Sequence, residues 1–313
     1  MQTITLGRSN LTATVAGLGT GGFSRIGFFK YGPEHAASIV RAAFDEGVNF
    51  FDSAEIYGTE SAVGAGLDGI ARDKYILSTK FLHKRREGNI RTSAEFMESL
   101  EASLRALRTD YVDIYHLHGV HQNDYERVCE IFIPAMEKAR QQGKIRFPGV
   151  TEMFNTDTSH KMLRRAINDG FFDVVMVGYN LLNPSAAKTV APLAAEKNVG
   201  TLCMFAVRNA LSHPDILKKT VREILESGQA DAGALRPDED LSFLVTEGGA
   251  KSVMEAAYRF CRHTPGIDVV LTGTGSADHL RDNLASIEMP PLPEALLQRL
   301  AAMFGNVDCV TGE

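Results

Sequence analysis

The fold is decided by the stretch Phe50-Phe51-Asp52-Ser53-Ala54-Glu55-Ile56-Tyr57-Gly58. Its first two residues continue an apolar run that starts at Val48, directly after the chain-breaking Gly47, and this predicts a short buried strand. Asp52 stands where that strand ends, and Tyr57 follows on a loop closed by Gly58. An acid at the carboxyl end of a strand, with a phenol on the loop above it, is typical of a site at the top of a parallel barrel.

Strand-like and helix-like segments alternate along most of the chain. Strands are expected at residues 15–19, 48–52, 75–79, 111–117, 145–150, 173–177, 199–205 and 268–271. Helices are expected at residues 34–46, 60–68, 92–107, 124–142, 157–169, 186–197, 250–262 and 277–286. Eight alternations predict an α/β fold with an all-parallel sheet, and a (β/α)8 TIM barrel is the simplest closure. A doubly wound open sheet is the alternative, although no nucleotide-binding fingerprint follows the first strand.

Three segments lie outside this repeat. Residues 3–6 and 12–15 flank turn residues and predict an N-terminal β-hairpin. Residues 207–249 form a long loop after strand 7, with a helix expected at 214–227 and an acidic run, 238–240, expected to be solvated. The tail, residues 290–313, carries a helix at about 293–304 and could reach across the active face. We expect residues 1–313 to form one domain, because α/β barrels reach this length as single units.

Composition argues against several classes of function. The chain has 313 residues, 44% of them hydrophobic, and a formal net charge of -6 with no basic tract. A nucleic-acid partner or an anionic membrane surface is therefore not expected, and no apolar run approaches the ~18 residues needed to cross a bilayer. The first residues start a strand-like segment and lack the regions of a signal peptide. The cysteines have no metal-ligand spacing, which predicts reduced thiols in a cytoplasmic protein. They are Cys129, Cys203, Cys261 and Cys309.

Four polar residues stand at or just beyond the ends of strands two, three and four. They are Asp52, Tyr57, Lys80 and His118, and a barrel brings neighbouring strand ends into one pocket. The set suits carbonyl reduction, because a carbonyl that accepts hydride develops negative charge on oxygen that must be protonated or stabilised. A phenol has an ordinary pKa near ~10, and a nearby ammonium favours its ionised form. Asp52 can hold the lysine in place, and His118 can donate a hydrogen bond to the carbonyl oxygen.

No metal site is expected. His116 and His118 are alternate residues of one strand, and no third ligand is placed beside them. We expect His116 to point inward one layer deeper than His118, as a hydrogen-bonded core histidine.

The order and spacing of several motifs resemble the aldo-keto reductase superfamily over nearly the whole chain. The matching segments are Phe51 to Gly58, Ser78-Thr79-Lys80, Asp113 to His118, Gly143 to Arg146 with Gly149-Val150, Tyr179 to Leu182, and Gly273 to Leu280 with Asn283. The resemblance implies a (β/α)8 barrel that uses a nicotinamide cofactor, usually NADP(H), to interconvert carbonyls and alcohols. It also implies that Tyr57 is the general acid/base, tuned by Lys80 and Asp52, and that His118 orients the substrate carbonyl.

The same resemblance implies a set of cofactor-binding residues. They are Gly19, Thr20, Gly21, Asp52, Thr151, Glu152, Met176, Met204, Phe205, Arg208, Gly273, Thr274, Gly275, Ser276, His279 and Asn283. Thr151-Glu152 stands where relatives commonly have Ser-Asn or Ser-Glu to hold the carboxamide, and Met176 replaces a Gln. The aromatic residue that stacks on the nicotinamide aligns with either Met204 or Phe205.

The 2′-phosphate of NADP(H) has no evident partner in these motifs. Family members selective for NADP(H) often carry a basic residue near the eighth strand, where this chain has uncharged residues 273–276 and His279 in place of Arg. Arg281 or Arg208 could substitute. NADP(H) is the expected cofactor, with NAD(H) possible.

Functions of different classes are compatible with these residues. The first is an NAD(P)(H)-dependent oxidoreductase acting on a small aldehyde, ketone or sugar, as a monomer or small homo-oligomer. The second is a cofactor-binding regulatory subunit that acts through a protein partner. A third is a Schiff-base enzyme with Lys80 as its nucleophile. The substrate cleft is expected to be lined by Phe23, Phe28, Phe29, Phe81 and Leu82.

Overall fold

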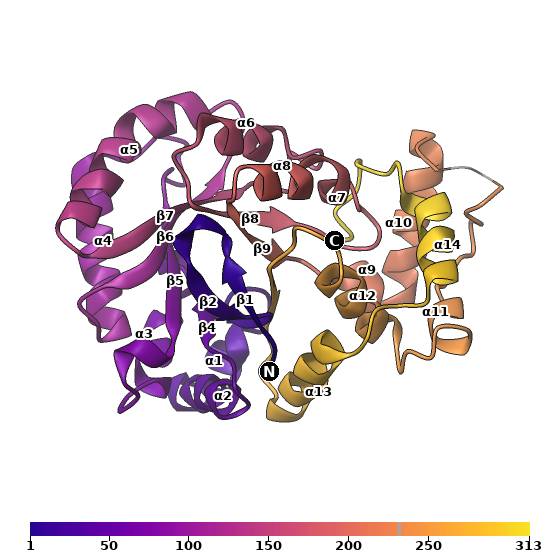
Figure 1. The fold of residues 1–313 in the computed structure, drawn as a ribbon, viewed down its shortest axis with the longest axis horizontal. Helices are drawn as coiled ribbons and strands as arrows, with labels where there is room; N and C mark the ends of the chain where they lie inside the picture. Colours follow the sequence, from indigo (N-terminus) through magenta and orange to yellow (C-terminus); the bar gives the residue numbers. More distant parts are fainter. Residues whose placement is uncertain (231–232) are drawn as a thin grey trace.

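The structure, a computed structural model, describes residues 1–230 and 233–313 and is built on a closed barrel of parallel strands (Figure 1). The strands follow one another around the barrel in chain order, and β10 pairs with β3 to close it. They are β3 (Ala16–Gly19), β4 (Phe50–Asp52), β5 (Ile76–Leu82), β6 (Val112–Val120), β7 (Ile145–Glu152), β8 (Val174–Gly178), β9 (Gly200–Met204) and β10 (Val269–Thr272). The predicted (β/α)8 TIM barrel is confirmed, and the open-sheet alternative is wrong.

Helices cover the outside of the barrel between successive strands. They are α2 (Pro33–Asp45), α3 (Glu60–Gly66), α4 (Ser93–Leu107), α5 (Tyr125–Gln141), α6 (Lys161–Asp169), α7 (Ala186–Thr189), α8 (Ala191–Glu196), α12 (Val253–Arg262) and α13 (Ala277–Glu288). Side chains alternate along each strand, so Phe51 packs outward into the main core with helix residues such as Val40, whereas Phe50 packs inside the barrel. Asp52 therefore points inward as well, toward the barrel axis.

Two helices differ most from the sequence expectation. The helix expected at 186–197 is two short helices, because Pro192 has no N–H and its ring clashes with the carbonyl group four residues earlier. The helix expected from residue 157 starts at Lys161, because His160 has a left-handed backbone with φ 61°. Asp157 instead caps α6, and its carboxylate accepts the backbone N–H groups of Lys161 and Met162 at 3.0 and 2.8 Å.

The predicted N-terminal hairpin is present and closes the amino-terminal end of the barrel. Strands β1 (Thr3–Leu6) and β2 (Leu11–Thr14) are antiparallel. Gly7 lies so close to β9 that a Cβ atom there would be 2.3 Å from the backbone nitrogen of Gly200. Arg8 fixes the hairpin through a 2.6 Å bond from its Nε to Asp173, just before β8. The barrel interior is filled from this end by apolar side chains that include Leu6.

A second lobe packs beside the barrel and has its own apolar core. It consists of helices from the long loop after β9 and from the tail, seen at the orange and yellow end of the ribbon in Figure 1. These are α9 (Asn209–Ser212), α10 (Pro214–Ser227), α11 (Phe243–Thr246) and α14 (Glu294–Phe304). The expected helices at 214–227 and 293–304 are confirmed. The expectation that residues 238–240 are solvated is wrong for Glu239, which is 3% exposed and accepts the N–H of Leu241.

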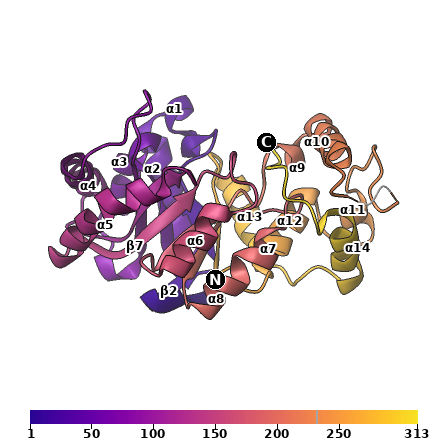
Figure 2. The same cartoon turned by 90° about the horizontal axis from the view of Figure 1, so that it is seen from above.

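The tail crosses to the carboxyl-terminal face of the barrel, as the sequence suggested. The amide nitrogens of Asn180 and Asn183 donate to the backbone oxygens of Thr311 and Val310 at 3.1 and 2.8 Å. In Figure 2 residue 313 lies near α9 at one end of the barrel, while residue 1 and β2 lie at the other. Within the described parts of the chain, no helix has both the length and the apolarity to cross a membrane.

Candidate active site

The deepest part of the candidate site is a buried ion pair between β4 and β5. Nζ of Lys80 donates to Oδ2 of Asp52 at 2.5 Å and to the backbone oxygen of Ser53 at 2.6 Å. Ser78 donates to the other carboxylate oxygen of Asp52 at 2.7 Å. Burial raises the pKa of Asp52, and the Lys80 ammonium opposes that shift. Both oxygens of the carboxylate and two donor directions of the ammonium are thus fixed inside the protein.

Tyr57 lies above this pair on a 3-10 turn, Glu55–Tyr57. Its hydroxyl is 3.4 Å from Nε2 of His118, and its ring centroid is 5.1 Å from Nζ of Lys80. Gly21 makes room for the phenol, because a Cβ atom at that position would be 2.7 Å from Cε2 of Tyr57. The structure therefore brings together all four residues that the sequence predicted for catalysis.

His118 and His116 occupy the inward face of β6 at different depths. Burial, followed by the positive charge of Lys80, holds the pKa of both histidines well below the ordinary value. Each ring is consequently neutral near pH 7. Nε2 of His116 lies 3.1 Å from the hydroxyl of Ser78, and His116 is fully buried. The prediction that His116 is a hydrogen-bonded core histidine is confirmed.

The loop after β3 supports Tyr57. Thr20 is fully buried, and its hydroxyl lies 3.0 Å from that of Ser53 and 2.8 Å from that of Thr59. Gly19 and Gly21 flank it. At the end of β7, the hydroxyl of Thr151 accepts the N–H of Gly119 at 2.7 Å and so fixes the backbone next to His118.

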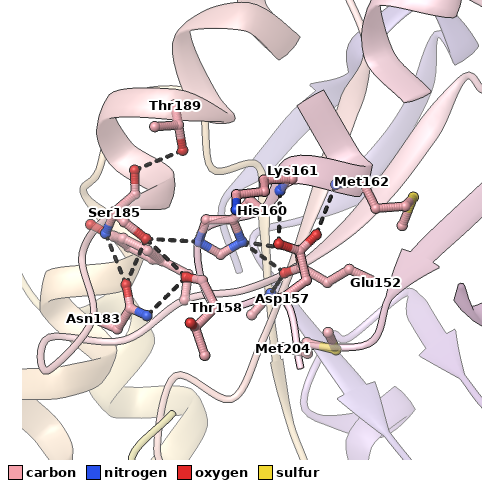
Figure 3. A network of polar contacts seen from close by, with 12 residues as sticks. Glu152, Asp157, Thr158, His160, Lys161, Met162, Asn183, Ser185, Thr189 and Met204 are labelled. Atoms are coloured by element: carbon pink, nitrogen blue, oxygen red, sulfur yellow. Dashed lines mark hydrogen bonds and ion pairs between the residues drawn. The ribbon is translucent and has the colours of Figure 1, made fainter. Parts of the chain in front are cut away.

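Glu152 belongs to a closed internal network (Figure 3). Nδ1 of His160 is 3.0 Å from both of its carboxylate oxygens, and the N–H of Gly178 donates to one of them at 2.8 Å. Nε2 of His160 is 3.0 Å from the hydroxyl of Ser185, which in turn donates to Asn183. Burial raises the pKa of Glu152, and His160 opposes the shift. This network joins β7 to the segment after β8, and no motif in the sequence indicated it.

Phe205, rather than Met204, presents an aromatic face at the carboxyl end of β9. Its ring stacks on Phe154 at 6.2 Å, and the guanidinium of Arg208 lies 4.0 Å from the ring centroid. Met204 and Met176 pack against the apolar interior of the barrel. Arg208 forms an ion pair with Glu313 and donates to Asn155 at 3.0 Å, and burial lowers its pKa to about 10.

Two clefts on this face join into one groove. The smaller, about 440 Å³, is lined by residues that include Gly21, Phe205 and Arg208. The larger, about 540 Å³, extends between α12 and α13. They share Val207, Ser212 and Gly273.

The larger cleft contains several predicted cofactor-binding residues and one basic residue that the sequence reasoning missed. The predicted residues are Gly273, Thr274, His279 and Asn283, and the addition is Lys251. The side chain of Asn283 donates to Thr272 at 2.9 Å. Gly275 and Ser276 have structural contacts instead. A Cβ atom at Gly275 would be 2.8 Å from the nitrogen of Gly27, and Ser276 caps α13.

Arg281 is excluded from this groove. It does not line either cleft, and its guanidinium pairs with Glu46 at 2.9 Å and Asp278 at 3.0 Å. In this structure the guanidinium of Arg281 is therefore engaged with carboxylates outside the groove.

The expected substrate-cleft aromatics divide into two groups. Phe23 and Phe29 are 84% and 74% exposed, and Phe23 lines the smaller cleft. Phe81 does not line the cleft, because it is fully buried against Phe96 and Phe132, on the outward face of β5. Arg25, which the sequence reasoning did not select, lies at the site, with its guanidinium carbon 4.7 Å from the ring centroid of Tyr57. In residues 1–230 and 233–313, no group of three or more His, Cys, Asp or Glu side chains could hold a metal ion.

Comparisons with known proteins agree with this geometry. The model of the aldo/keto reductase family matches residues 16–303. L-galactose dehydrogenase from Arabidopsis thaliana is 26% identical over 292 residues, which cover 90% of this chain and 86% of that protein. D-threo-aldose 1-dehydrogenase from a Pseudomonas species is 27% identical over 206 residues, 57% of this chain and 61% of that protein. The solved structure of an aldo-keto reductase from Bacillus halodurans in its holo form shares the fold with a TM-score of 0.73, at 23% identity, over 99% of this chain and 97% of that one.

Proposed function

Because the chain belongs to the aldo/keto reductase family, we propose that it interconverts a sugar or other small carbonyl with its alcohol, using Tyr57 as general acid/base. The observation that carries this proposal is the position of the Tyr57 hydroxyl. It is 3.4 Å from Nε2 of a neutral His118, and the buried Lys80–Asp52 pair lies behind its ring. Membership of the family makes the protein an NAD(P)H-dependent oxidoreductase.

The residues of the site divide the proton chemistry between them. A carbonyl oxygen placed between Tyr57 and His118 can accept hydrogen bonds from the phenol and from Nε2–H of the imidazole. When bound, the nicotinamide cofactor supplies or accepts the hydride. As negative charge develops on the oxygen, His118 stabilises it and Tyr57 transfers its proton to it. Lys80 then stabilises the phenolate that remains, and Asp52 keeps the ammonium in place. In the oxidative direction Tyr57 takes the alcohol proton.

The joined groove fits an extended nicotinamide dinucleotide. Its smaller cleft offers the aromatic ring of Phe205 and the backbone of Gly21, which packs on Tyr57, whereas the carboxylate of Glu152 is bound by His160 and by the N–H of Gly178. Its larger cleft offers the hydroxyl of Thr274, the amide of Asn283 and the imidazole of His279. These residues would hold the cofactor, while Gly19, Thr20, Gly21, Asp52, Met176, Met204, Gly275 and Ser276 shape the surrounding backbone and interior.

The basic residue best placed for a 2′-phosphate is Lys251. It lines the larger cleft with His279, and its ammonium has no ion pair within the described segments. Arg208 is already neutralised by Glu313. We therefore favour NADP(H). NAD(H) is the alternative, because Asp282 lines the same cleft and would suit a ribose hydroxyl better than a phosphate.

The substrate class follows from the relatives. Both L-galactose dehydrogenase and D-threo-aldose 1-dehydrogenase are named for sugars, so a sugar carbonyl is our first candidate. The test is a panel of aldehydes, ketones and sugars assayed in both directions with each cofactor, with Tyr57→Phe as the inactive control. Absence of Tyr57-dependent turnover over the whole panel would refute the proposal.

Neither alternative function has support in the structure. A regulatory role alone does not need the assembled set of Asp52, Tyr57, Lys80 and His118. A Schiff-base mechanism with Lys80 is not favoured, because its ammonium is fully buried and donates to Asp52 and to the Ser53 carbonyl. A cytoplasmic location is part of our proposal, since all four cysteines are free thiols. The state of association, monomer or small homo-oligomer, stays a prediction.

A further inference from the structure

Arg25 lies over the ring of Tyr57, and none of the described residues forms an ion pair with it. Its guanidinium carbon is 4.7 Å from the ring centroid of Tyr57. Its NH1 atom is buried and has no hydrogen-bond partner within residues 1–230 and 233–313. Over the same residues it takes part in no ion pair. A buried donor that is left without an acceptor is costly, so such a group is expected to meet an acceptor when a ligand binds.

The other charged groups around the site already have partners. Lys80 is neutralised by Asp52, and Arg208 by Glu313. The carboxylate of Glu55 accepts from Arg91 and from the N–H of Leu82, both at 2.6 Å, so it is not directed at Arg25. The neutral state of His118 adds no charge, and Arg25 itself contributes to keeping the pKa of that histidine low. Arg25 thus adds a positive charge that no ion pair in the described residues neutralises, in a protein whose net charge is -6.

The loop that carries Arg25 is held in an unusual conformation. Arg25 and Ile26 both have positive φ, 44° and 49°, which is rare for a residue with a side chain and rarest for a β-branched one. Nε2 of His35 bonds the backbone oxygen of Gly275 at 2.8 Å, and Gly275 packs on Gly27. Backbone strain of this kind persists where surrounding contacts impose it, and it is concentrated at ligand-binding sites.

We propose that Arg25 binds an anionic group of the substrate, a carboxylate, and that the enzyme prefers small carbonyl acids, such as aldehyde acids or uronic acids, to their neutral counterparts. The inference rests on the function proposed above and specifies its substrate class. Because the guanidinium lies over the ring of Tyr57, the carboxylate and the reacting carbonyl belong to one small molecule and are separated by few bonds. Arginine suits this role, since its planar fork binds carboxylate through two parallel hydrogen bonds. The exposed ring of Phe23, which lines the same cleft as Arg25, can cover the apolar part of such a molecule.

The experiment compares matched pairs of substrates. Succinic semialdehyde is assayed against its methyl ester, and glucuronate against glucose, and the ratio of kcat/KM for acid over neutral compound is determined for each pair. The wild-type ratio should exceed about ten, and Arg25→Gln should lower it by roughly tenfold to a hundredfold, the range of a hydrogen bond between charged groups. Arg25→Lys, which keeps the charge but loses the fork, should fall between the two.

Lys30→Gln is the matched control. Lys30 is on the same loop, in α1 (Phe28–Tyr31), and its exposed ammonium does not line the cleft with Arg25. This change also removes one positive charge and should leave the ratio at its wild-type value. If Arg25→Gln does not fold, the dependence of KM on salt concentration in the wild-type enzyme provides the test instead. KM for the acid should then rise with ionic strength while KM for the neutral compound stays constant.

The other outcomes are equally decisive. Turnover of the neutral compounds with no preference for the acids would overturn this inference and leave the oxidoreductase proposal intact. A higher KM for the cofactor in Arg25→Gln, with an unchanged acid-to-neutral ratio, would show that Arg25 binds cofactor phosphate instead. Absence of turnover for these compounds and for the whole panel of aldehydes, ketones and sugars would refute the proposed function itself.

Discussion

Nζ of Lys80 lies 2.5 Å from Oδ2 of Asp52, and the two side chains are 0% and 4% exposed. Water therefore contributes little to either charge, and each ion depends on the other for its stability in the interior. The pair stabilises the fold and, in our proposal, its ammonium also stabilises the phenolate of Tyr57. Substitutions at both positions can separate these two effects.

Lys80→Met should remove both stability and activity. The change leaves the Asp52 carboxylate buried without a counterion, so the free energy of unfolding should fall by about 3–5 kcal/mol. Adding Asp52→Asn removes the unpaired charge and should restore most of the stability, but not turnover, because the ammonium near Tyr57 is still missing. Urea unfolding and steady-state kinetics of both variants provide the measurement. Equal stability of the single and double variants would contradict the prediction.

Tyr57→Phe should nearly abolish turnover while the affinity for cofactor stays similar. The change removes only the hydroxyl that faces Nε2 of His118, and loss of an acid/base group lowers kcat by roughly 10²–10⁴-fold. Tyr31→Phe removes the hydroxyl of an exposed tyrosine on the neighbouring loop and serves as the control. Retention of more than about a tenth of wild-type kcat would rule out Tyr57 as the acid/base.

These four residues could be predicted from the sequence because each one lies in the last residues of a strand or on the turn after it. Asp52, Lys80 and His118 belong to β4, β5 and β6, and Tyr57 is five residues beyond Asp52. The alternation of apolar strands and amphipathic helices also predicted the barrel. Spacing along the sequence is enough to predict a residue's position when that position is set by its own strand or by the turn after it.

Other site residues could not be predicted, because their positions depend on loops. Arg25 faces Tyr57 only because residues 25 and 26 adopt positive φ, a conformation that neither side chain favours. Lys251 reaches the cleft because the long segment after β9 returns to α12 beside α13. The contact between Glu152 and His160 likewise requires a left-handed residue just before α6. No periodic pattern encodes these features.

Acid should destabilise the protein through its buried histidines. Burial and Lys80 hold the pKa of His116 well below its ordinary value, whereas the unfolded chain keeps a value near ~6.5. Between these two values the unfolded state binds a proton that the folded state does not. The histidine's contribution to stability is therefore complete above about pH 6.5 and is lost as the pH falls toward the folded value.

The test compares the pH dependence of unfolding in two variants. His116→Gln should flatten the slope of the unfolding free energy below about pH 6.5 by up to ~1.4 kcal/mol per pH unit. His213→Gln alters an exposed histidine and should retain the wild-type slope. An unchanged slope in His116→Gln would mean that this histidine is not held neutral by the fold.

Lys251 should determine the preference between the two cofactors. Its ammonium lines the larger cleft beside His279 and has no ion pair in the described residues. A 2′-phosphate would therefore gain a hydrogen bond between charged groups that NAD(H) cannot make. In Lys251→Met the ratio of kcat/KM for NADPH over NADH should fall by roughly tenfold to a hundredfold, mainly through KM for NADPH.

Arg281→Ala is the control, since that guanidinium is bound to Glu46 and Asp278 and lies outside the groove. Its ratio should equal that of the wild type. If the wild type prefers NADH and Lys251→Met leaves the ratio unchanged, the ammonium does not meet a phosphate. The adenosine end would then be recognised through uncharged contacts with Thr274 and Asn283, with Asp282 bound to the ribose.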